Sequence, residues 1–128
     1  MRRYNPSRTP DAAWWLSLDE SERIDLARRS QRPDEHPPSP RLHATIHVIV
    51  ENQVALGSEI PVAATLERLM AEGLDRHDAI HAIGSVLASF IYHAAQPGAA
   101  DDLGGVDLQE TYWHDLAGLS ARSWRGDR

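Results

Sequence analysis

Two segments of this chain carry histidines at every fourth position, and this spacing constrains the fold more than any other feature. The first segment, HATIHVIVE, holds His43, His47 and Glu51, and the second, RHDAIH, holds His77 and His81. Residues four apart lie one above another on a single face of an α-helix. Each segment therefore predicts a helix with a polar stripe, whose neighbouring imidazoles can converge on one site.

Capping residues mark the start of both histidine-bearing helices. Ser39 followed by Pro40 is typical of an N-cap with proline at the first helical position, so a helix is predicted over residues 41–56. Asp75 is a suitable N-cap for the second helix, which is predicted to run to about Ala94. Both stripes are thus expected on well-defined helices.

The rest of the chain also has helical patterns. Asp19 and Glu22 form a capping-box signature that divides residues 11–31 into two short helices. A further amphipathic helix is predicted over residues 62–72, and Asp107 with Glu110 indicates a last one. The fold class is therefore all-α, with about five to six short helices packed around the central histidine-bearing pair.

The 128 residues are expected to form a single domain, 1–128. A segment with four prolines in eight residues, 33–40, cannot be helical throughout and is interpreted as a linker or lid. The locally basic ends, 1–10 and 119–128, are interpreted as flexible tails.

Composition limits the chemistry and the partners. The chain has no cysteine, and all 13 basic residues are arginine, which excludes thiol nucleophiles, thiolate metal sites and Schiff-base lysines. The net charge of -6 argues against nucleic-acid binding, and no apolar run is long enough to span a membrane. Without cysteine or an apolar run behind the N-terminal arginines, a cytoplasmic location is expected.

Both stripes lie on the apolar faces of their helices, so their side chains are expected to point toward the core or a cleft. Buried polar groups need partners, and the two stripes are the natural partners of each other. We therefore predict a divalent metal site, for zinc, iron, nickel or manganese, with Asp78 as an outer-shell support or a further ligand. Arg76 could bind an anionic substrate, but an arginine in the first turn of a helix is more often solvated. The predicted ligands are His43, His47, Glu51, His77 and His81.

Other interpretations of the same residues stay open. The histidines could form a structural hydrogen-bond network or a pH-responsive cluster. HAIG at 81–84 is similar to the HDIG element of HD-type phosphohydrolases, but Ala82 replaces the aspartate. The two helices around Gly73 could form a helix-turn-helix, although the second has no basic residue beyond Arg76.

The block 42–92 resembles a domain-of-unknown-function family of small bacterial all-helical proteins. Members of that family have a His-x-x-x-His helix followed by a D-R-H-[DE]-A-x-H-A-I element, matched here by His43, His47, Arg76, His77 and His81. The resemblance implies no activity, substrate or cofactor.

Two functional hypotheses follow. The first is a metal-dependent enzyme or metal sensor whose small-molecule substrate the sequence does not identify. The second is a non-enzymatic interaction module in which the histidines form a buried network and two copies of the chain pair as a homodimer.

Overall fold

A computed structural model describes residues 3–30, 39–98 and 108–126. This part of the chain contains seven α-helices and no strand, which confirms the all-α prediction with slightly more helices than expected. They are α1 (Ala12–Ser17), α2 (Glu20–Arg29), α3 (Pro40–Ala55), α4 (Val62–Ala71), α5 (Arg76–Ala94), α7 (Leu108–Gly118) and α8 (Ala121–Trp124), with a short 3₁₀ turn, η1 (Gly57–Glu59), after α3.

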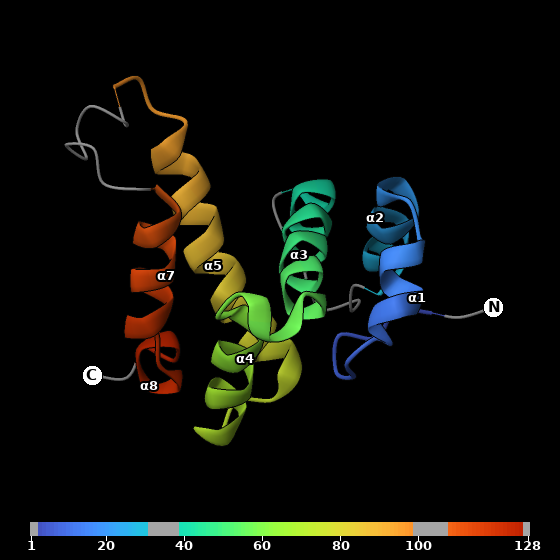
Figure 1. Cartoon of the computed structure of the whole chain (residues 1–128), viewed down its shortest axis with the longest axis horizontal. Coiled ribbons are helices and arrows are strands. Elements are labelled where there is room, and N and C mark those ends of the chain that lie inside the picture. The colour runs from blue at the N-terminus through green and yellow to red at the C-terminus, as the bar shows by residue number, and fades with distance from the viewer. Residues whose placement is uncertain (1–2, 31–38, 99–107, 127–128) are drawn as a thin grey trace.

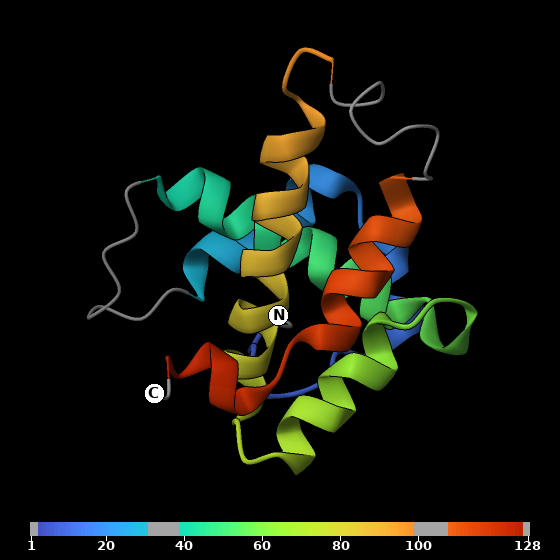
Figure 2. The same ribbon diagram turned by 90° about the vertical axis from the view of Figure 1, so that its left-hand side faces the viewer.

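Helix α3 lies in the middle of the fold. It packs against α1 and α2 on one side and against α5 and α4 on the other, while α7 packs against α5 (Figure 1). The view turned by 90° shows α5 crossing α3, with α7 beside α5 (Figure 2). The two histidine-bearing helices are therefore direct neighbours.

Two clusters of apolar side chains flank α3. The larger cluster lies among α3, α4, α5, α7 and α8, and its fully buried members include Leu69, Ile83 and Leu116. The smaller cluster joins the N-terminal residues, α1 and α2 to α3 through Trp15 and Val48. Burial of this apolar surface on both sides fixes the position of α3 in the fold.

Capping explains where the helices begin. The side chain of Asp19 accepts the Glu22 N–H and Glu22 returns the interaction, so the predicted capping box is present at α2. Ser39 accepts the Leu42 N–H, with Pro40 in the first turn of α3. Asp75 caps α5 by accepting the Asp78 N–H. These contacts satisfy backbone donors that a helix start leaves unpaired.

Within the predicted flexible tails, 1–10 and 119–128, the described residues include buried side chains. Tyr4 is only 5% exposed and packs against Trp15, and Ala121 is 2% exposed at the start of α8. Tyr4 and Ala121 pack among apolar neighbours. The nearby arginines do not prevent this burial. Of the predicted linker 33–40, the structure describes only Ser39 and Pro40. Asp107, the predicted cap of the last helix, lies outside the described residues.

In the part of the chain that the structure describes, no helix is both long enough and apolar enough to cross a membrane.

Candidate metal centre

Helix α3 presents its stripe toward α5. His47 and Glu51 are buried, at 5% and 1% exposure, and His43 is half-buried one turn earlier. The polar stripe sits between the two apolar clusters, because Val48 packs into the smaller one and Val50 into the larger one. The sequence pattern therefore predicted the direction of this stripe.

Helix α5 supplies the facing stripe. His77 is 2% exposed in the first turn, and His81 is half-buried one turn later. The next residue along this face, Gly84, allows a close approach, because a Cβ atom there would lie 2.9 Å from Cγ2 of Ile46 on α3. The missing side chain thus brings α3 and α5 together beside the histidines.

Four imidazoles meet where the helices cross, and we call them the histidine cluster: His43, His47, His77 and His81. Ring centroids lie 5.0 Å apart for His43 and His81, 4.9 Å for His47 and His81, and 4.3 Å for His77 and His81. The structure therefore brings together all four histidines that the sequence singled out.

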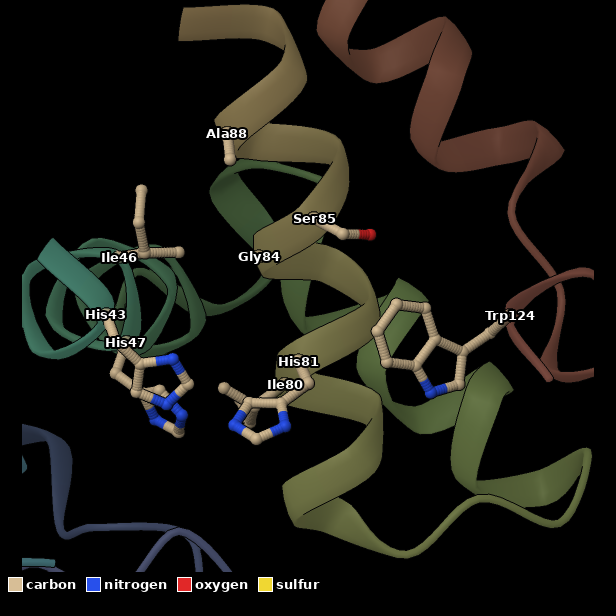
Figure 3. Close-up of a pocket in the computed structure, with 9 residues that line it drawn as sticks. All are labelled: His43, Ile46, His47, Ile80, His81, Gly84, Ser85, Ala88 and Trp124. Carbon is tan, nitrogen blue, oxygen red and sulfur yellow. The ribbon is translucent and has the colours of Figure 1, made fainter. Parts of the chain in front are cut away.

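Three of these residues form a tighter group, which we call the histidine triplet. One nitrogen each from His43, His47 and His81 lies within 4.8 Å of the other two. Figure 3 shows the rings from α3 and the ring from α5 pointing toward a common space. His77 is not a member of this triplet and packs edge-on against His47 and His81. Among the described residues, the triplet is the group of nitrogens whose spacing could hold one metal ion.

Glu51 has a different partner from the one expected. Its Oε1 accepts from Nη2 of Arg76 at 2.7 Å and its Oε2 accepts from Nη1 at 2.8 Å. Arg76 is 3% exposed, in contrast to its predicted solvation. This bidentate ion pair engages both carboxylate oxygens and neutralises a charge that burial would otherwise penalise. The expected supporting carboxylate, Asp78, is exposed.

Arg76 also holds the N-terminal segment over the site. Its Nη1 donates to the Pro6 carbonyl at 2.9 Å, and its Nε donates to Oγ1 of Thr9 at 3.2 Å. The hydroxyl of Tyr4, from the same segment, donates to Oε2 of Glu51. One buried guanidinium therefore links the N-terminal segment, α3 and α5.

Tyr4 connects this ion pair to the histidine cluster. Its hydroxyl oxygen lies 3.2 Å from Nδ1 of His47. Burial, followed by the charge of Glu51, raises the pKa of Tyr4 well above 10, so its single proton stays on the oxygen and is donated to the carboxylate. The tyrosine oxygen is then an acceptor for an Nδ1–H of His47. This tautomer leaves the Nε2 lone pair of His47 available to a ligand.

The cluster disfavours protonation of His47. Burial lowers the pKa of His47 from 6.5 to about 2, and repulsion from His81, His43, His77 and Arg76 acts in the same direction. A neutral imidazole is the form that coordinates a metal, so His47 needs no proton loss at neutral pH.

A pocket of about 310 Å³ opens beside the triplet. The three histidines of the triplet line this pocket (Figure 3). The other lining residues come from α3, α5 and α8 and are mainly apolar. A second pocket of about 290 Å³ lies between the N-terminal segment and α1 and does not include the histidines. The triplet therefore faces a space large enough for a small molecule.

Sequence reasoning missed Tyr4 and misplaced Arg76. The only local signal at Tyr4 is a single aromatic residue in an otherwise polar N-terminal segment. The signal at Arg76 is its position four residues before Ile80, on the buried face of α5. Both residues are positioned by contacts more than 20 positions away along the chain.

The fold and the cluster define a class: an all-helical protein whose two crossing helices hold a buried group of histidines. Residues 17–105 match the family described as a domain of unknown function (DUF1841), and the chain belongs to this family. The match includes the whole histidine cluster and the Glu51–Arg76 pair, but neither Tyr4 nor α8. No curated protein and no solved structure matches the chain.

Proposed function

We propose that this protein binds one divalent metal ion through the histidine triplet and that the ion keeps an open coordination position toward the adjoining pocket. The observation that carries the proposal is the convergence of His43, His47 and His81, whose nitrogens lie within 4.8 Å of one another. In a tetrahedral site with Zn–N bonds of about 2.1 Å, the nitrogens are roughly 3.4 Å apart. On binding the ion, the three imidazoles would have to rotate so that these nitrogens move closer together.

The surroundings support a metal ligand set of nitrogens alone. Glu51 gives both oxygens to Arg76, so it acts as a support that orients Tyr4, and through Tyr4 it orients His47. Imidazole donors suit zinc, iron and nickel, whereas manganese prefers carboxylate and water oxygens. Of the four metals considered from the sequence, the first three are therefore the better candidates, and His77 is the nearest additional imidazole.

Three protein ligands beside a pocket favour a reactive or sensing site over a purely structural one. Structural zinc sites are closed by four protein ligands, while catalytic sites keep a position for water or substrate. A metal in this position would activate a bound water or polarise a bound ligand. The chemistry is thus that of a metal-dependent enzyme or a metal sensor.

Elemental analysis of untagged protein purified without chelator tests the proposal. We expect about one equivalent of metal per chain in the wild type, and its loss in the His47→Ala, His81→Ala double variant. His93→Ala is the matched control, because His93 lies exposed on the same helix α5 and should leave the metal content unchanged. Chelator should lower the unfolding temperature of the wild type and of His93→Ala but not of the double variant, since a ligand bound to the native state stabilises it by mass action.

The competing hypothesis, a non-enzymatic module with a buried histidine network, predicts a different result. The wild type would then take up no metal on incubation with zinc, iron or nickel, and chelator would not change its unfolding temperature. The double variant would still be less stable, because it loses buried polar contacts. That combination would overturn the metal proposal.

A further inference from the structure

The pocket beside the histidine triplet has a distinct floor and two walls. One face of α5 forms the floor, through His81, Gly84, Ser85 and Ala88, which have the i, i+3, i+4, i+7 spacing of a helical stripe. Figure 3 shows Ile46 and the two α3 imidazoles on one side of α5, and Trp124 on the other side. At Gly84 the side chain of Ile46 lies close to the α5 backbone, since a Cβ atom there would be 2.9 Å from Cγ2 of Ile46.

The lining of the pocket changes from imidazoles at the triplet end to mainly apolar side chains away from it. The side-chain nitrogens of the lining are those of the three imidazoles at the triplet end and the indole N–H of Trp124 on the opposite wall, and none of the nine lining residues is an aspartate, glutamate, arginine or lysine. The only lining hydroxyl, that of Ser85, donates to the Ala82 carbonyl at 2.8 Å and so satisfies its proton within α5. Away from the triplet, the side chains of Ile46, Ile80, Ala88 and Trp124 offer apolar surface. This surface would favour an apolar group over a polar one.

We infer that the site takes a small organic ligand with a single metal-binding head and an apolar body, the head on the ion and the body between Ile46 and Trp124. The inference rests on the proposed metal site. A volume of about 310 Å³ suits a body of one ring or a short branched chain. The absence of charged lining residues excludes phosphorylated or multiply charged ligands as good fits, because nothing besides the ion would compensate their charge.

Two probes with the same head and different bodies test this assignment. Imidazole and 4-phenylimidazole both offer one nitrogen donor, and only the second has an apolar ring. Each is titrated into full-length protein loaded with cobalt(II), whose visible spectrum reports directly on a new ligand. We expect both probes to shift the spectrum, and 4-phenylimidazole to bind at least about tenfold more tightly because its ring is buried.

A pocket variant identifies where the ring binds. Ala88 is exposed at the pocket, so Ala88→Phe fills space without disturbing the core. We expect it to reduce the preference for 4-phenylimidazole to within about threefold while the affinity for imidazole stays within about twofold. Ala64→Phe is the matched control, because Ala64 is exposed on α4 and does not line the pocket. Trp124→Ala, which removes the opposite wall, should also weaken the preference.

The outcomes separate the ligand inference from the metal site. Cobalt binding with equal affinities for the two probes, or a preference that survives in both Ala88→Phe and Trp124→Ala, would overturn the ligand inference and leave the metal site standing. A protein that takes up no cobalt would overturn both.

Discussion

At the scale of single residues, the pair of Glu51 and Arg76 is the most consequential contact outside the histidine cluster. Its two charges are 1% and 3% exposed, so each depends on the other for compensation. We expect Glu51→Gln to lower the free energy of unfolding by about 3 to 5 kcal/mol, because it leaves a buried guanidinium without its counter-charge. Urea denaturation of the metal-free protein measures this loss.

A surface ion pair provides the control for that variant. On α2, Nη2 of Arg29 lies 3.0 Å from Oδ2 of Asp25, and both side chains are more than half exposed. Asp25→Asn should change the unfolding free energy by less than about 0.5 kcal/mol, since water screens such a pair. Equal losses for Asp25→Asn and Glu51→Gln would contradict the central role given to the buried pair.

Tyr4→Phe tests whether the N-terminal segment orients a metal ligand. The variant keeps the ring that packs on Trp15 and removes the hydroxyl shared by Glu51 and His47. We expect metal affinity to fall about ten- to hundredfold, as is typical when a support of a ligating histidine is lost. Competition with a chromophoric chelator measures the affinity, and Tyr92→Phe, at an exposed site on α5, should leave it unchanged. Lower stability with unchanged affinity would mean that Tyr4 is only a packing residue.

Residue types and spacing predicted the histidine cluster because a helix converts a four-residue repeat into a face. The same reasoning could not identify the partner of Glu51. From its position on the stripe, the Glu51 carboxylate is a reasonable metal ligand. Its actual partner, Arg76, reaches it only because α3 and α5 pack together. The contribution of Tyr4 likewise depends on tertiary packing.

At the scale of elements, the contact between α3 and α5 determines how close the two stripes lie. Gly84→Ala would place a Cβ atom 2.9 Å from Cγ2 of Ile46, which is tighter than a packed core accepts. We expect this variant to lower the free energy of unfolding by about 1 to 3 kcal/mol and to weaken metal binding, because the helices must separate. Thermal or urea unfolding measures the first effect and chelator competition the second.

The sign of the Gly84 effect should reverse when Ile46 is shortened. Alanine is intrinsically better than glycine inside a helix by about 1 kcal/mol. In an Ile46→Ala background the clash is gone, so Gly84→Ala should be neutral or stabilising. Gly118→Ala, where an added Cβ has nothing within 4 Å, gives the reference for a glycine without a close neighbour. Destabilisation that persists in the Ile46→Ala background would show that the close approach is not the cause.

Helix starts were predictable wherever a cap follows from local chemistry, as at Asp19, Ser39 and Asp75. The packed N-terminal segment and α8 were not, since their positions depend on tertiary contacts such as that of Tyr4 with Trp15. Burial of Arg76 at the start of α5 was likewise not predictable from local chemistry.

At the scale of the whole molecule, the site joins the two halves of the core. The smaller apolar cluster contains Tyr4, the larger one contains Ile80, and the histidine cluster lies on α3 and α5 between them. Opening the site therefore requires separation of packed elements, so the charge state of the histidines is linked to global stability. This linkage predicts how the free energy of unfolding of the metal-free protein changes as the pH falls.

The expected response follows from the lowered pKa of His47. In the unfolded chain His47 binds a proton below its ordinary pKa of 6.5, whereas in the folded protein it stays neutral until about pH 2. Between these values the unfolded state holds one more proton, so stability is fully present above 6.5 and falls as the pH falls.

The pH dependence of unfolding thus tests the buried, neutral state of His47. For this one residue the free energy of unfolding should decrease by about 1.4 kcal/mol for each pH unit below 6.5. His47→Gln cannot bind the proton and should show a slope smaller by that amount between pH 6 and pH 5. His93→Gln, which alters an exposed histidine on α5, should keep the wild-type slope. Identical slopes in the wild type and His47→Gln would mean that His47 is protonated in the folded protein. Such a protonated imidazole would have to lose its proton before it could coordinate a metal.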